Sequence, residues 1–126
     1  MKNIVYLLVL LAIGCQNNQT SDITLNDGQK WQVNREMALH FEAMEADIAK
    51  FQTGDDLAEL QSRLKTNISD LTTKCTMKGQ AHDELHKWLV PFIDEVNAMQ
   101  TDNPTGAIEK LRGQFDNYHL YFVSES

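Results

Sequence analysis

Apolar side chains recur every three or four residues over most of the chain, the spacing of helices with one buried face. Four segments carry such a stripe, and glycine, asparagine or proline separates them. No segment shows the alternation of apolar and polar residues that is typical of a half-buried strand. The stripes comprise Met37, Phe41, Met44, Ile48 and Phe51; Leu57, Leu60, Leu64, Ile68, Leu71 and Cys75; His82, Leu85, Leu89, Phe92, Val96 and Met99; and Ile108, Leu111, Phe115, Tyr118 and Phe122.

Residues that favour helix starts precede three of the stripes. Asn34 stands before the first as a predicted N-cap, and Asp56 with Glu59 resembles a capping box before the second. Asn103-Pro104 pairs an N-cap with a first-turn proline before the fourth. The links between the segments are short, so consecutive helices should run antiparallel. We therefore predict an all-α, up-down-up-down four-helix bundle over residues 31–126.

The first residues do not fit the bundle and are typical of a bacterial export signal. Lys2 precedes an unbroken apolar run, Ile4–Ile13, which is too short to span a bilayer. Ala12-Ile13-Gly14-Cys15 is similar to the lipobox of bacterial lipoproteins, with Ala12 in place of the usual leucine. We predict that residues 1–14 are a lipoprotein-type signal peptide and that Cys15 is lipidated. Ordinary secretion with cleavage nearby is the alternative.

The stretch after Cys15 is polar and reads as a tether. Residues 15–30 are therefore assigned to the lipidated cysteine and a linker that joins the domain to a membrane. The predicted location is the bacterial cell envelope, with the domain periplasmic or exposed at the surface. The formal net charge of the 126-residue chain is −7, which argues against binding nucleic acid.

The predicted topology gathers the metal-capable side chains at one end of the bundle. In an antiparallel bundle the first and third helices start where the second and fourth helices end. The candidate metal ligands that this arrangement brings to the shared end are His82, His86, Cys75, Met77, His40 and His119.

Within this group, His82 and His86 are four residues apart and can bind one ion from a single helical face. His82 occupies a stripe position and should point inward, where an imidazole needs a hydrogen-bond partner or a metal. Cys75 and Met77 would suit Cu(I), and adding imidazoles extends the range to Cu(II) or zinc. Copper is the favoured ion and zinc the second. The alternative is that these side chains only pack, as a lone cysteine commonly does.

The sequence does not indicate an enzyme. It lacks a nucleophile elbow, a phosphate-binding loop and a CxxC pair. Cys75 and His82 could form a nucleophilic pair, but no group is available to orient the histidine or to stabilise an oxyanion. The Glu-x-x-His pattern of di-iron bundles is also missing, apart from loose fragments such as Glu36 with His40.

One segment resembles a family of small envelope lipoproteins of flavobacteria and their relatives. The resemblance rests on the motif CTMKGxxHDxLHxWLxP, which begins at Cys75 and ends at Pro91. Lys30-Trp31 and Val33 before the first helix are similar as well. The resemblance implies a lipid-anchored envelope protein with this fold and does not imply an activity.

A second resemblance is to the periplasmic four-helix b-type cytochromes. In that family a methionine early in helix one and a histidine late in helix four hold the haem iron, and Met37 and His119 occupy similar places. Residues 107–121 are also similar to the last helix of these cytochromes. The resemblance implies that Met37 and His119 would be axial ligands of haem b.

Three functional hypotheses follow. The first is a membrane-tethered envelope protein that sequesters copper or zinc, or delivers it to an envelope protein partner. The second is a b-type haem protein for electron transfer. The third is a non-catalytic structural or interaction module, in which the same residues pack the end of the bundle.

Overall fold

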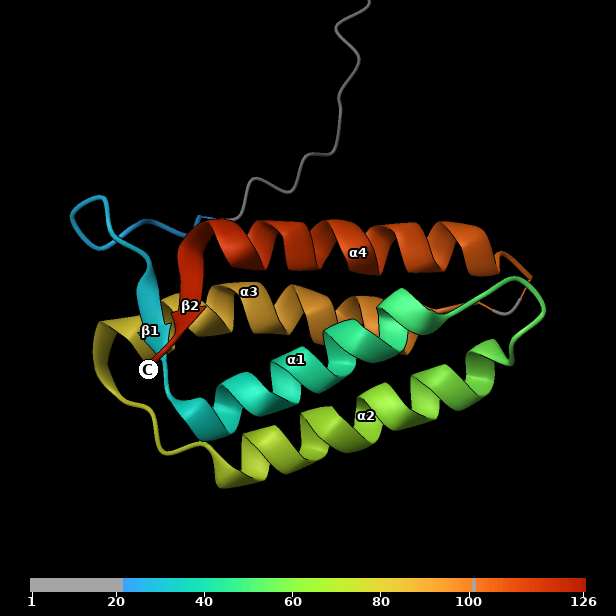
Figure 1. Ribbon diagram of the computed structural model, residues 1–126, viewed down its shortest axis with the longest axis horizontal. Helices are drawn as coiled ribbons and strands as arrows, with labels where there is room; N and C mark the ends of the chain where they lie inside the picture. Colours follow the sequence, from blue (N-terminus) through green and yellow to red (C-terminus); the bar gives the residue numbers. More distant parts are fainter. Residues whose placement is uncertain (1–21, 101) are drawn as a thin grey trace, which may run out of the picture.

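The computed structural model describes residues 22–100 and 102–126. The predictions for residues 1–14, for Cys15 and for residues 16–21 lie outside this range. The described chain forms an antiparallel up-down four-helix bundle, which confirms the predicted fold class (Figure 1). The elements are β1 (Trp31–Val33), α1 (Arg35–Lys50), α2 (Leu57–Lys74), α3 (Gly79–Ala98), α4 (Pro104–Tyr121) and β2 (Phe122–Ser124).

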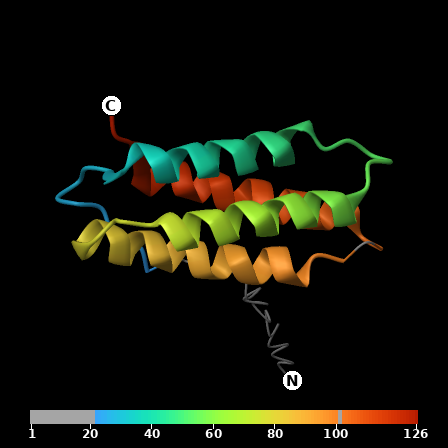
Figure 2. The ribbon, with the colours of Figure 1, turned by 90° about the horizontal axis from the view of Figure 1, so that it is seen from below.

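The four helices form a closed ring in which each helix packs against two others. α1 lies against α2 and α4, and α3 lies against the same two helices, so α1 and α3 are diagonal to each other (Figure 2). This arrangement follows from short connections between antiparallel helices. Among the described residues, no helix is both long enough and apolar enough to cross a membrane.

Side-chain caps start three helices as the sequence predicts. The Asn34 side chain accepts a hydrogen bond from Met37 N at 3.0 Å, and the Asp56 side chain accepts one from Ala58 N at 2.9 Å. Asn103 caps α4, with Pro104 as its first residue. These bonds satisfy backbone N–H groups that have no partner within the helix. α3 differs, because Lys78 precedes it without a side-chain cap.

The core is built around the indole of Trp88. The centroid of its ring lies 4.8 Å from that of Phe92, on which it stacks, and 5.5 Å from that of Phe41, which it meets edge to face. Its Nε1–H donates to the backbone oxygen of Gln114 at 2.7 Å, which satisfies the one polar atom of the side chain. α1, α3 and α4 therefore meet at one aromatic cluster, whose members are Phe41, Trp88, Phe92, Phe115, Tyr118 and Phe122.

A two-stranded parallel sheet closes one end of the bundle, and the sequence does not predict it. β1 pairs with β2 so that Trp31 lies opposite Phe122 and Val33 lies opposite Ser124. The backbone N–H of Glu125 also donates to Val33 O at 2.9 Å. Strands of three residues are too short to display a readable alternation, and their pairing joins the two ends of the domain.

The sheet also corrects the end of the fourth helical stripe. The sequence placed Phe122 on the helix, whereas α4 ends at Tyr121 and Phe122 begins β2. Phe122 is nevertheless buried, because its ring stacks on Tyr118 with centroids 5.2 Å apart. The apolar spacing therefore predicted correctly that Phe122 is buried, but wrongly that it belongs to the helix.

Residues 22–30 pack against the bundle, although the sequence assigned them to the tether. We call them the N-terminal strap. Ile23 is buried in the core, and Asn26 and Gln29 exchange two backbone hydrogen bonds across a tight turn. Asp27 and Gly28, the central residues of this turn, both have positive φ, as a type I′ turn requires. The ordered domain thus extends back at least to Ile23.

Candidate functional site

The helix ends that carry the candidate ligands meet at the end of the bundle closed by the sheet. α1 and α3 start there, and α2 and α4 end there (Figure 1). The topology therefore brings the polypeptide segments together as the sequence predicts. Whether the side chains also meet depends on the direction in which each helix presents them.

His82 and His86 are the candidate ligands that contact each other. Their ring centroids lie 4.3 Å apart with an interplanar angle of 65°. His86 is exposed and His82 is half-buried, so His82 does not enter the core as its stripe position predicted. The reason is that the buried face of α3 is centred on Leu85, Trp88 and Phe92, and His82 lies at its margin. The two imidazole rings therefore lie in contact on the first turns of α3, outside the buried face of the helix.

Cys75 and Met77 precede the histidine pair in the sequence and occupy packing positions. Cys75 is a free, half-buried thiol that ends α2, and Met77 lies in the link before Gly79. Both side chains pack against the hydrophobic core. Gly79 has a φ of +77°, a backbone conformation that favours glycine and that turns the link into α3. The thiol and the thioether are therefore apolar packing groups of the core.

The other two histidines have partners elsewhere in the bundle. His40 Nδ1 lies 3.2 Å from Asn67 Oδ1 on α2. His119 Nε2 lies 2.8 Å from a Glu45 carboxylate oxygen, and its side chain is 55% exposed. Glu45 is ten residues into α1, or about 15 Å along the helix from its start. His40 and His119 are thus directed to the sides of the bundle rather than to His82.

The expected convergence into one centre with several ligands is consequently not found. The part of the chain that the structure describes contains no group of three or more His, Cys, Asp and Glu side chains placed to hold a metal ion. Topology fixed which helix ends meet, but the partner of His119 lies about 15 Å along α1 from that end. The helical phase of each residue, which adds about 100° per position, decided the direction of its side chain.

Met37 and His119 do not have the arrangement that haem b needs. Met37 is buried in the core, whereas His119 is exposed and its Nε2 is paired with Glu45. Tyr118 and Phe41, which are close to these two residues in sequence, have ring centroids 5.1 Å apart. Haem binding would require the ion pair to break and these packed rings to separate, so the residues do not fit the group.

Tyr118 is not a catalytic candidate either. Burial raises the pKa of its phenol, and the nearby carboxylates of Glu42 and Glu45 raise it further. The hydroxyl therefore stays protonated over the physiological range. Tyr118 acts as a member of the aromatic cluster.

Glu84 is a buried charged residue that the sequence did not single out. Only 4% of the residue is exposed. Its carboxylate accepts from Thr24 N at 3.1 Å and from Lys87 Nζ at 2.9 Å. Nothing in the local pattern signals this role, because Thr24 is 60 residues away in the chain.

These contacts control the ionisation of Glu84. Burial alone would raise the pKa of the carboxyl group, but the hydrogen bonds from Lys87 and from Thr24 N, with the charge of Lys87, lower it below 4.5. The charged form is therefore favoured in the folded state. Glu84 is a buried carboxylate that links the N-terminal strap to α3.

We predict that Glu84→Gln lowers the free energy of unfolding at neutral pH relative to the wild type. A folded-state pKa below the unfolded value means that the charge contributes stability above the unfolded pKa and loses it as the pH falls through the folded pKa. The difference in the free energy of unfolding should therefore shrink as the pH falls below 4.5. Urea unfolding at neutral and acidic pH measures it; a constant difference would contradict the assignment.

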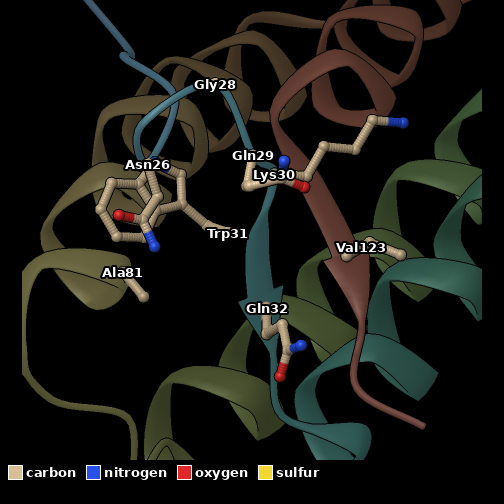
Figure 3. A pocket seen from close by; sticks show the side chains of 8 residues that line it. All are labelled: Asn26, Gly28, Gln29, Lys30, Trp31, Gln32, Ala81 and Val123. Carbon is tan, nitrogen blue, oxygen red and sulfur yellow. The ribbon is translucent and has the colours of Figure 1, made fainter.

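A surface hollow of about 790 Å³ lies next to the sheet (Figure 3). It is bounded by the strap turn, the start of α3 and the outer side of the sheet. Lys30 is the one charged residue in its lining, so the hollow offers no acid–base pair and no metal ligand set. Its lining residues are Asn26, Gly28, Gln29, Lys30, Trp31, Gln32, Ala81 and Val123.

Comparison of the chain with protein-family models, with curated proteins and with solved structures finds no match. The functional assignment therefore depends on the geometry of the molecule.

Proposed function

We propose that this protein is a membrane-tethered, four-helix protein of the bacterial cell envelope that binds a transition-metal ion through His82 and His86. Copper is the favoured ion, followed by zinc. The observation that carries the proposal is the contact between two imidazole rings on one face of α3, whose centroids lie 4.3 Å apart. The lipid on Cys15 would hold the protein at the membrane.

The available ligands favour a metal site in which water fills some of the coordination positions. Two imidazoles four residues apart supply two nitrogen ligands, and Cu(II) and zinc both accept nitrogen with water in the other positions. Cys75 and Met77 could join only by leaving their packing against the core. His40 and His119 would first have to leave Asn67 and Glu45. The primary ligands are therefore His82 and His86 alone.

An open site supports delivery to a partner better than permanent storage. A partner protein can supply further ligands to an ion that has vacant or water-filled positions, and the ion can then pass on by ligand exchange. A closed set of four protein ligands would release the ion more slowly. We propose an envelope protein as that partner, and no enzymatic activity is assigned.

We expect His82→Ala with His86→Ala to lower the affinity for Cu(II) by at least about tenfold. Both nitrogen ligands are lost, and removing only a hydrogen-bond partner of a metal ligand already costs about this much. Calorimetric titration of the purified domain with Cu(II) and with zinc measures the affinity, and electron paramagnetic resonance detects nitrogen coordination to copper.

His40→Ala and His119→Ala are the matched controls, because each removes one histidine outside the pair. Both variants should keep the wild-type affinity. Loss of binding in either control, with binding retained in the double variant, would overturn the assignment of ligands. A Soret band in protein isolated from cells would favour the haem alternative with Met37 and His119, and a stable protein that takes up neither metal nor haem would favour an interaction module.

A further inference from the structure

We propose that the Glu84 contact with the N-terminal strap turns the outer face of α3 toward the membrane. The inference rests on the proposed lipid anchor at Cys15 and does not depend on metal binding. The occupant of this face is the lipid surface to which the chain is attached.

The strap is held to α3 by polar and apolar contacts together. Thr24 donates its backbone N–H to Glu84, and Lys87 Nζ donates to the backbone oxygen of Asp22 at 3.3 Å. Ile23 between them is buried in the core. The Nε1–H of Trp31 donates to Thr24 O, which ties the strap to β1 as well. The chain therefore leaves the domain at Asp22, beside Lys87.

The chain between this exit point and the anchor is short. Residues 16–21 separate Cys15 from Asp22, and even a fully extended chain of this length spans at most about 25 Å. The bundle is two helices thick, on the order of 20 Å. A chain that leaves beside α3 cannot pass around the bundle and still reach a membrane on the opposite side. The tether therefore excludes a membrane on the side of α1, and the exit of the chain beside Lys87 favours the side of α3.

The face so selected is defined by the spacing of its exposed residues. Asp83, Lys87, Val90 and Asp94 are separated by four, three and four positions, so they share the outward side of α3, and all are exposed. This face carries both signs of charge, and the whole chain is acidic. Charge attraction to lipid therefore does not orient the domain, and the point of attachment does.

Two exposed residues provide matched probe positions. Val90 on α3 is 52% exposed, and Leu39 on the diagonally placed α1 is 51% exposed. Val90→Cys and Leu39→Cys would each be made in the full chain with Cys75→Ser, so that an acylated Cys15 leaves one reactive thiol. Energy transfer from a fluorophore on that thiol to acceptor-labelled lipid gives the distance of closest approach to the bilayer. Vesicles of phosphatidylcholine carry the lipidated protein.

We expect the probe at position 90 to lie closer to the bilayer than the probe at position 39 by roughly 20 Å, the thickness of two helices. Ile23→Ala with Glu84→Ala should reduce this difference, because release of the strap lengthens the tether to residues 16–30, with a reach of about 55 Å. The control is Leu25→Ala with Asp83→Ala, which truncates an exposed neighbour of each residue. The control should keep the full difference.

The outcomes separate the orientation from the anchor. Mass spectrometry of the purified protein shows whether Cys15 carries lipid, and absence of lipid overturns both the anchor and the orientation. Equal distances for the two probes in a lipidated protein overturn the orientation alone. A full difference that persists in the Ile23→Ala, Glu84→Ala variant, with its strap shown to exchange amide hydrogens rapidly, overturns the role of Glu84.

Discussion

Trp88→Ala is expected to lower the free energy of unfolding by about 3–5 kcal/mol, a large share of the stability of a small domain. The indole contacts Phe41, Phe92 and other rings of the aromatic cluster, so its removal leaves a cavity among side chains from three helices. Its hydrogen bond to Gln114 O is lost as well. Urea unfolding followed by circular dichroism measures the change.

Val90→Ala is the control for this substitution, because Val90 lies on the same helix and is exposed. Its effect should be within about 0.5 kcal/mol. Trp88→Phe should fall between the two, since it keeps an aromatic ring and removes the N–H donor. A Trp88→Ala effect as small as that of Val90→Ala would contradict the placement of Trp88 at the centre of the core.

Phe122→Ala is expected to cost about 3–4 kcal/mol, although this residue lies four positions from the C-terminus. Phe122 is 1% exposed, stacks on Tyr118, and pairs with Trp31 in the parallel sheet. The substitution removes the buried ring that holds β2 against the bundle. Thermal unfolding of the variant and the wild type in the same buffer gives the difference.

The neighbouring substitution Val123→Ala tests whether burial is the cause. Val123 is 46% exposed and points to the other side of the same strand, so its loss should cost less than about 1 kcal/mol. Equal effects at the two positions would contradict burial of the Phe122 ring as the cause. Amide exchange in β1 should rise in Phe122→Ala and stay low in Val123→Ala, because the two strands share hydrogen bonds.

The candidate site shows how far a sequence argument reaches. The four-residue spacing of His82 and His86 implied that they share a face, and their rings are in contact. The grouping of His40 and His119 with them relied on topology alone. Both have partners on neighbouring helices instead, and Glu45, the partner of His119, lies about 15 Å from the start of α1.

The role of Glu84 could not have been read from its neighbours in the chain. A glutamate in the second turn of a helix is normally solvated, and its burial here depends on a strap that arrives from 60 residues away. The parallel pairing of β1 with β2 is a similar case, since it joins residues near the two ends of the domain.

The sequence by itself determined the four helices, three of their caps and most of the buried stripes. These features depend on interactions within a few residues, which the spacing of apolar side chains and capping residues displays directly. Tertiary structure alone decided the sheet, the Glu84 contact and the separation of the histidine pair from His40 and His119, which have other partners. Each of these depends on the distance and direction between segments far apart in the chain, which only the packed bundle fixes.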